Sequence, residues 1–272
     1  MELNPVFSAF SILGMCLITV GVVFAAFEGG FHLGAHRGQR STKEKDSLVG
    51  PMVGAIIGLL AFMLSFTFGV ASSHFDTRQQ LVLEEANTVR TAYAMAGLLA
   101  EAPRNEAQKL LREYIGIRSG QMGDITSEEK LTRILARSNQ IQDQLWSMAM
   151  EGQINNAGAA SSYLYVQALN DMANLQAKRI VAGTHGRISM TIWILLYGLV
   201  IFGMAAMGYH AGLVGVRGFF VYQALIFTFS FVLVLIFDLD RPRPGLFRVS
   251  QQAMIDLHQK ISAPDVMILK MK

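Results

Sequence analysis

Two charged motifs lie directly after long apolar segments, where an ionisable side chain has to be solvated or paired. Arg78 follows the second apolar segment, and Asp238 and Asp240 follow the fourth, with Arg241 and Arg243 close behind. A charge at the edge of an apolar layer is costly without water or a partner. We therefore predict an ion-pair clamp in which Arg78 or Arg241 binds the aspartate pair. The alternatives are solvation by water and lipid headgroups, or an anion-binding site at Arg78, Arg241 or Arg243.

A second group of candidate residues follows Arg78 in a polar stretch and consists of Glu84, Glu85 and Asn87. If several copies of this helix surrounded an axis, the two carboxylates would ring the mouth of a pore. Such a ring attracts cations rather than anions. Glu84, Glu85 and Asn87 are therefore candidates for a cytoplasmic vestibule, and the alternative is an ordinary solvated helix face.

Small residues recur along the second apolar segment at the three- and four-residue spacing that forms one stripe on a helix. The stripe consists of Gly50, Gly54, Gly58, Ala61, Ser65, Gly69 and Ser72. One interpretation is a packing seam, because small residues let a neighbouring helix approach closely. The other is a pore wall in which Phe62 and Phe66 form an apolar constriction that gates by dewetting. The predicted pore-lining residues are Gly54, Gly58, Phe62, Ser65, Phe66 and Gly69.

Residue patterns typical of catalysis do not occur in this sequence. It contains no phosphate-binding glycine-rich loop, no His-Glu-x-x-His pattern and no nucleophile elbow. His32 and His36 have a spacing that suits a metal, but no third ligand is evident, and Cys16 is the single cysteine. We therefore predict no enzyme activity, no cofactor and no metal site. The net charge of +3 without a dense basic block also argues against nucleic acid as a partner.

The elements that must position these residues are four apolar segments, at about 6–27, 49–73, 188–209 and 216–237. Each is close to the length that a bilayer requires. They account for a composition that is 52% hydrophobic and only 16% charged. We predict a transmembrane hairpin over 1–73, a polar domain over 74–187, a second hairpin over 188–237 and a tail over 238–272. The glycine-rich basic stretch 28–48 is predicted to be a loop.

The polar domain has the pattern of helices throughout. From the second membrane segment the chain continues with no Pro or Gly before Gly97, and the stretch to about residue 101 predicts one helix about 75 Å long. Further helices are predicted from Glu106, capped by Asn105, and after a capping box at 126–129, with a break at 155–158. No stretch shows sustained period-two alternation. The predicted fold is an all-α integral membrane protein with four transmembrane helices and a helical cytoplasmic domain between spans two and three.

The membrane topology follows from the number of spans. Four spans place both termini and the 74–187 domain on one side, and the count of basic residues near the membrane ends favours the cytoplasm for that side. We predict a multi-pass protein of the inner, or plasma, membrane.

The two charged motifs and the four-span layout resemble the bestrophin-like family of bacterial membrane proteins. The matching stretches are Arg78 with Glu84-Glu85-Ala86-Asn87, and Asp238-Leu239-Asp240-Arg241-Pro242 with the residues that follow to Val249. Bestrophins proper are oligomeric anion channels, usually pentamers, whose second membrane helix lines the pore. The resemblance thus implies a homo-oligomer in a lipid bilayer that conducts inorganic ions, with chloride-like anions favoured. The alternative is a non-conducting membrane scaffold or signalling protein that recruits partners through its cytoplasmic helices.

Overall fold

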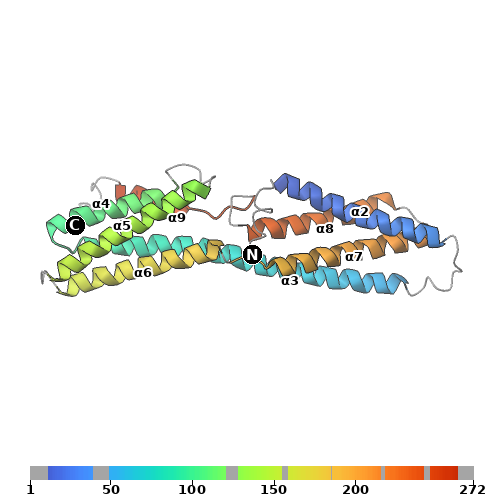
Figure 1. The fold of residues 1–272 in the computed structure, drawn as a ribbon, viewed down its shortest axis with the longest axis horizontal. Coiled ribbons are helices and arrows are strands. Elements are labelled where there is room, and N and C mark those ends of the chain that lie inside the picture. The colour runs from blue at the N-terminus through green and yellow to red at the C-terminus, as the bar shows by residue number, and fades with distance from the viewer. Residues whose placement is uncertain are drawn as a thin grey trace, which may run out of the picture. The chain divides into compact units, whose positions relative to one another are not determined.

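The computed structural model describes residues 12–38, 49–120, 128–154, 159–184, 186–215, 218–241 and 246–262, and no β-strand occurs within these ranges. Its helices are α2 (Ile12–Gly38), α3 (Val49–Ala96), α4 (Glu101–Arg118), α5 (Glu128–Ile154), α6 (Ala159–Thr184), α7 (Met190–Val214), α8 (Phe219–Asp240) and α9 (Gln252–Ser262) (Figure 1). The all-α fold predicted from the sequence is confirmed. The chain divides into unit 1, Met1–Phe75 with Gly186–Arg248, and unit 2, Asp76–His185 with Val249–Lys272.

Unit 1 contains the helices that are long and apolar enough to cross a membrane. These are α2, α3, α7 and residues Phe220–Asp240 of α8. Four membrane-spanning helices were expected from the apolar segments, and this prediction is confirmed. Their shared core includes Leu60 of α3, Leu196 and Val200 of α7, and Leu233 of α8, all fully or almost fully buried.

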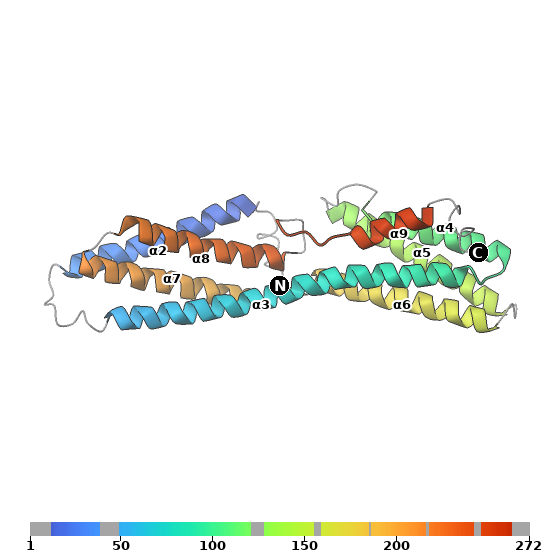
Figure 2. The same ribbon diagram turned by 180° about the vertical axis from the view of Figure 1, so that it is seen from behind.

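Helices α2 and α7 pack side by side through glycines that both helices contribute (Figure 2). A Cβ atom at Gly30 would lie 2.8 Å from the carbonyl carbon of Ala205, and one at Gly212 would lie 2.6 Å from the backbone nitrogen of Ala35. Gly34 and Gly208 meet the facing backbone equally closely. The two helices therefore touch backbone to backbone, which only residues without a Cβ allow.

The loop predicted over 28–48 is wrong for residues 28–38, because α2 continues as a helix to Gly38. Glycine lowers helix propensity by about 1 kcal/mol relative to alanine, which favours a loop assignment from sequence. Here Gly30 and Gly34 lie against α7, and this packing outweighs the low propensity. His32 and His36 consequently lie on a helix, with their side chains exposed.

Helix α3 runs without interruption from Val49 to Ala96, so the predicted long helix is confirmed. Its apolar half belongs to unit 1 and its polar half to unit 2. Ser72 and Ser73, at the change from apolar to polar sequence, are both helical. Every residue from the predicted pore wall to Asn87 therefore belongs to a single helix.

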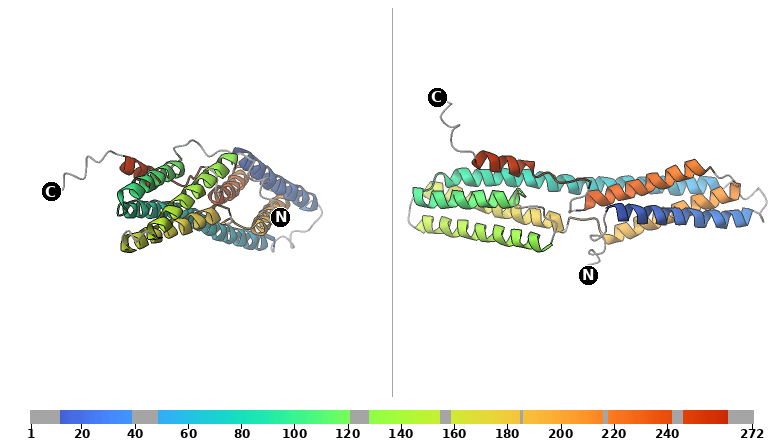
Figure 3. Two further views of the ribbon diagram at one scale, coloured as in Figure 1. Left: turned by 60° about the vertical axis from the view of Figure 1, so that its left-hand side comes forward. Right: turned by 90° about the horizontal axis from the view of Figure 1, so that it is seen from above.

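Unit 2 is a bundle formed by the polar half of α3 with α4, α5, α6 and α9. Helix α5 lies against α4 and α6, and α9 lies against α4 (Figure 3). Fully buried side chains of its core include Val89, Leu111, Ile141, Leu145 and Met172. Helix α9, within the predicted tail, adds Met254 and Leu257 to this core.

The predicted start of α4 at Glu106 is wrong, because the helix begins at Glu101 and contains Asn105. Pro103 is tolerated because it falls in the first turn, where the backbone N–H has no helical acceptor. The Arg104 guanidinium donates to the Leu99 carbonyl oxygen at 2.9 and 3.1 Å and stabilises this junction. Part of the predicted capping box and the predicted break at 155–158 lie outside the described residues.

Candidate functional site

The apolar half of α3 has one buried and one exposed face. The buried face comprises Val53, Leu60, Leu64, Thr67 and Ala71, which follow helical spacing. The predicted pore-lining residues all lie on the exposed face. Phe62 and Phe66 expose 65% and 62% of their surface, and a Cβ atom at Gly54, Gly58 or Gly69 would meet nothing within 4 Å. The stripe is thus open at Gly54, Gly58 and Gly69 within the described protomer, whereas Gly50 at its start lies against His210.

A shallow hollow of about 350 Å³ follows this exposed face toward the end of unit 1. It is lined by Ser65, Phe66, Gly69, Val70, Ser73 and His74. Along α3 these residues run from Ser65 and Phe66 to Ser73 and His74. The hollow therefore brings an aromatic ring and an imidazole side chain to the same face of α3.

Asp238 and Asp240, at the end of α8, are almost fully buried, and their carboxylates bind neighbouring parts of unit 1. Asp240 Oδ1 accepts from the backbone nitrogen of Ile188 at 3.0 Å and lies 3.5 Å from Nδ1 of His74 on α3. Asp238 Oδ2 accepts from the backbone nitrogen of Phe247 at 2.9 Å. The pair thus fixes the end of α8 to α3, to the start of α7 and to the segment after α8.

The arginines of the predicted clamp lie in different environments. Arg78 is buried in the first turns of the polar half of α3, and the guanidinium of Arg241 lies 5.6 Å from the centre of the Phe237 ring. That distance is suitable for a cation–π contact. Arg243 lies outside the described residues.

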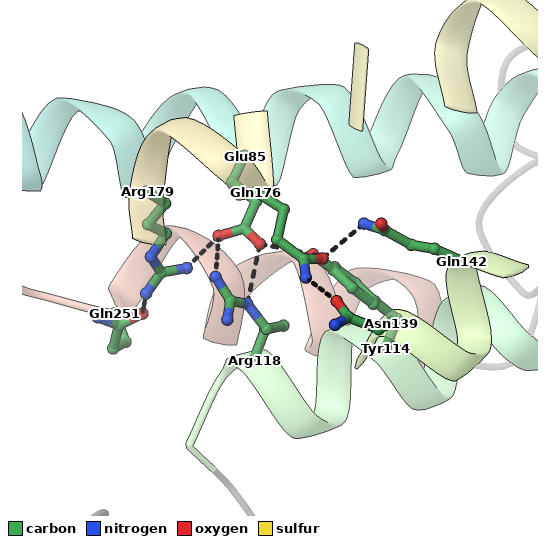
Figure 4. Close-up of polar contacts among 8 residues, drawn as sticks. All are labelled: Glu85, Tyr114, Arg118, Asn139, Gln142, Gln176, Arg179 and Gln251. Atoms are coloured by element: carbon green, nitrogen blue, oxygen red, sulfur yellow. Dashed lines mark hydrogen bonds and ion pairs between the residues drawn. The ribbon is translucent and has the colours of Figure 1, made fainter. Parts of the chain in front are cut away.

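Glu85 does not face a vestibule in this chain, because its side chain is fully buried inside unit 2 (Figure 4). Its carboxylate accepts from Tyr114 Oη at 2.8 Å, from Arg118 Nε and Nη2 at 2.9 and 3.1 Å, and from Arg179. Burial by itself would raise the pKa of Glu85, but the two guanidinium groups outweigh it and hold the pKa below its usual value. Glu85 therefore carries its negative charge inside the core.

An amide network extends this charged cluster across the bundle. Gln176 Oε1 accepts from Gln142 Nε2 at 2.6 Å and lies 3.1 Å from Tyr114 Oη, and Gln176 Nε2 donates to Asn139 Oδ1. On the other side, Arg179 Nη2 donates to Gln251 Oε1 at 2.8 Å. The polar side chains thus join α3, α4, α5, α6 and the residue that precedes α9.

Sequence inspection missed this cluster, although the sequence contains a signal for it. Glu85 stands in helical register with Val82, Val89 and Ala92, so a carboxylate occupies a core position. Glu84 and Asn87, in contrast, lie outside that register. Glu84 is half-buried and accepts from Gln80 at 3.0 Å, and Asn87 is exposed. Among the described residues, no three metal-ligating side chains gather in one place.

The comparison with protein families decides the affiliation of this chain. The model of the bestrophin-like domain matches residues 12–254. The chain belongs to the bestrophin-like family. Comparison with curated proteins gives no significant match.

Solved structures show the same fold for this bestrophin-like protein. A bacterial bestrophin homologue from Klebsiella pneumoniae with a point mutation is 18% identical, with a TM-score of 0.61 over 92% of this chain and 98% of that chain. A second mutant of that homologue is 17% identical, with a TM-score of 0.54 over 93% and 99% of the two chains. A structure described as a membrane protein is 17% identical, with a TM-score of 0.57 over 92% and 97%. The family and the four apolar helices together establish a membrane protein of this fold.

Proposed function

We propose that this bestrophin-like protein assembles into an oligomeric ion channel whose ion path follows the exposed face of α3. The observation that carries the proposal is the exposure of Phe62 and Phe66 beside open glycines, on a helix whose other face is buried. Two large rings one turn apart would narrow a pore and exclude water when it is closed. Gly54, Gly58 and Gly69 would provide width on either side of the rings.

Contact with lipid alone explains this face less well. A helix that meets only hydrocarbon gains nothing from glycine or serine, which expose more of the polar backbone than aliphatic residues do. Small residues on a membrane helix instead serve close helix contacts or line a path for water and ions. Because the stripe is open within the protomer, its neighbour in our proposal is another copy of the chain or the ion path itself.

The finer properties of the channel are proposed by analogy with the family. These are conduction of chloride-like anions, a homo-pentamer, and an inner-membrane location with both termini and the 74–187 domain in the cytoplasm. Glu84 and Asn87 remain candidates for the vestibule, since neither is buried. The predicted clamp also remains a proposal for Arg78 and Arg241, in addition to the contact that His74 makes with Asp240.

The test is ion flux through purified protein in liposomes, with chloride and potassium measured separately. We expect flux in the wild type and a larger flux in Phe66→Ala, because truncation widens the constriction. Phe202→Ala is the matched control, since Phe202 is 74% exposed on α7 rather than on α3. Equal flux in all three proteins would remove Phe66 from the ion path.

The scaffold interpretation makes a different prediction for the same experiment. A scaffold would give no flux in wild type or in either variant across a range of pH and voltage. The exposed stripe of α3 would then serve only the contact between subunits.

A further inference from the structure

We infer that His32 and His36, in the last turns of α2, form a binding site for a divalent transition-metal ion of the Zn²⁺ or Cu²⁺ type. The inference is independent of the proposed channel function, because it concerns ion binding at one end of α2. The sequence alone predicts a loop around these histidines, and a loop would leave the distance between them undefined. In the structure both lie inside the helix Ile12–Gly38, whose regular backbone fixes their separation.

His32 and His36 stand four residues apart, which places them one above the other on the same face of α2. At this spacing the Cβ atoms of a helix lie about 5–6 Å apart, so two imidazoles can reach the same ion. The helical His-Glu-x-x-His motif uses the same spacing to bind zinc. Both histidines are exposed, and the side chain of His32 exposes 74% of its surface. A hydrated ion can therefore reach the rings and keep water in its remaining coordination positions.

Glu28 contributes a carboxylate one helical turn before His32. Its Oε2 atom lies 3.8 Å from His32 Nε2. A carboxylate next to one ring nitrogen is the usual neighbour of a metal-binding imidazole, because it orients the ring and makes the other nitrogen a better ligand. In this arrangement Nε2 of His32 faces Glu28, which leaves Nδ1 for the ion. The negative charge of Glu28 also lowers the electrostatic cost of placing a divalent cation at this face.

The ligands decide which class of ion this site would take. Glu28 and His36 are eight residues apart, about 12 Å along the helix axis, so they cannot bind one ion together. This agrees with the absence of a three-ligand group among the described residues. Two imidazoles with water suit zinc, nickel and copper, and copper binds most tightly of these. Mg²⁺ and Ca²⁺ prefer oxygen ligands and are not expected to bind.

An ion held by both histidines would join two successive turns of α2. This end of the helix contains Gly29, Gly30, Gly34 and Gly38, and glycine is a poor helix former. A ligand that binds only the helical state stabilises that state by mass action. We therefore expect bound metal to slow hydrogen exchange of the backbone amides over residues 28–38.

The experiment titrates tag-free, full-length protein in detergent with Cu²⁺ and counts the coordinating imidazole nitrogens by electron paramagnetic resonance. We expect one ion with two imidazoles in the wild type. His32→Gln and His36→Gln should each bind on the order of a hundredfold more weakly, because the second imidazole adds an intramolecular contact. Glu28→Gln should weaken binding about tenfold. His258→Gln, on α9, is the matched control and should bind like the wild type.

Hydrogen exchange provides a second measurement on the same proteins. Zn²⁺ should slow exchange over residues 28–38 in the wild type and in His258→Gln but not in His36→Gln, and Mg²⁺ should have no effect. This result, together with two-imidazole binding that both α2 variants lose, supports the site. Equal Cu²⁺ affinity in wild type and His36→Gln, or a spectrum with a single imidazole in the wild type, overturns it. Neither result bears on the channel, whose own test is ion flux.

Discussion

Replacing Gly30 by alanine should destabilise unit 1, whereas the same change at the adjacent Gly29 should not. Both residues lie inside α2, so their helix propensities change equally. A new Cβ atom at Gly29 meets nothing within 4 Å, but one at Gly30 would lie 2.8 Å from the Ala205 carbonyl carbon and 2.9 Å from its Cα atom. The two variants therefore differ only in what the added methyl group meets.

The size of the effect follows from the distance that α2 and α7 must move. Carbon atoms pack best at about 3.5–4.0 Å, so α2 and α7 must separate by about 1 Å to admit the methyl group. A gap of that size forfeits a quarter to a half of each van der Waals contact along the seam. Overpacking costs about 1–3 kcal/mol in well-packed interiors. The obstacle at Gly30 is backbone, which cannot rotate away as a side chain can. We therefore expect Gly30→Ala to lower the free energy of unfolding by about 3 kcal/mol.

The assay is unfolding of the full-length protein in detergent by titration with sodium dodecyl sulfate, followed by circular dichroism. Gly29→Ala should be unchanged or up to about 1 kcal/mol more stable than wild type, from its better helix propensity. Gly30→Ala should unfold at clearly lower denaturant. Equal free energies of unfolding for the two variants would show that α2 and α7 do not touch at Gly30, and would refute the packing described for unit 1.

Two further predictions concern the buried cluster of unit 2. Glu85→Gln should lower the stability of unit 2 by about 3–5 kcal/mol, because it leaves Arg118 and Arg179 buried without a counter-charge. Glu84→Gln, one residue away and only half-buried, should change it by less than about 1 kcal/mol. Faster hydrogen exchange of α4 and α6 in Glu85→Gln alone is the expected result, and equal exchange in both variants would contradict it. The pKa of Glu85 in the folded protein lies below the usual 4.5. The contribution of Glu85 to the free energy of unfolding is therefore complete above pH 4.5 and is lost as the pH falls through the folded pKa. After correction for intrinsic exchange rates, protection of unit 2 should stay constant from pH 8 to about pH 5 and then decline, with a smaller decline in Glu85→Gln; identical declines in both proteins would exclude Glu85 as the cause.

The features that the sequence predicted are those that local pattern determines. The apolar segments are long enough to identify four membrane helices, and the absence of a breaker before Gly97 predicts the continuous α3. In both cases one stretch of chain contains all the information. The resemblance of the two charged motifs led to the bestrophin-like family for the same reason, because each motif is contiguous.

The features that the sequence did not predict depend on partners far away in the chain. The sequence predicts a loop at the end of α2 because glycine has a low helix propensity, and the close packing of Gly30 and Gly34 against α7 that compensates for it is visible only in the folded chain. The local sequence makes Glu85 a vestibule candidate because its partners Arg118 and Arg179 come from α4 and α6, and no local pattern pairs them with it. Its register with Val82 and Val89 predicts burial, but burial alone does not identify the counter-charge.

The small-residue stripe of α3 suits packing as well as pore lining, and its glycines at 54, 58 and 69 have no packing partner within the protomer. Where α2 and α7 touch backbone to backbone, both helices contribute glycines: Gly30 and Gly34 from α2, and Gly208 and Gly212 from α7. On α3, a Cβ atom at Gly54, Gly58 or Gly69 would meet none of the described residues, and the exposed rings of Phe62 and Phe66 lie between Gly58 and Gly69. Small residues alone would suit a tight contact between copies. Large exposed rings among them would hold a second helix away, which favours an open space beside α3 and hence the ion path.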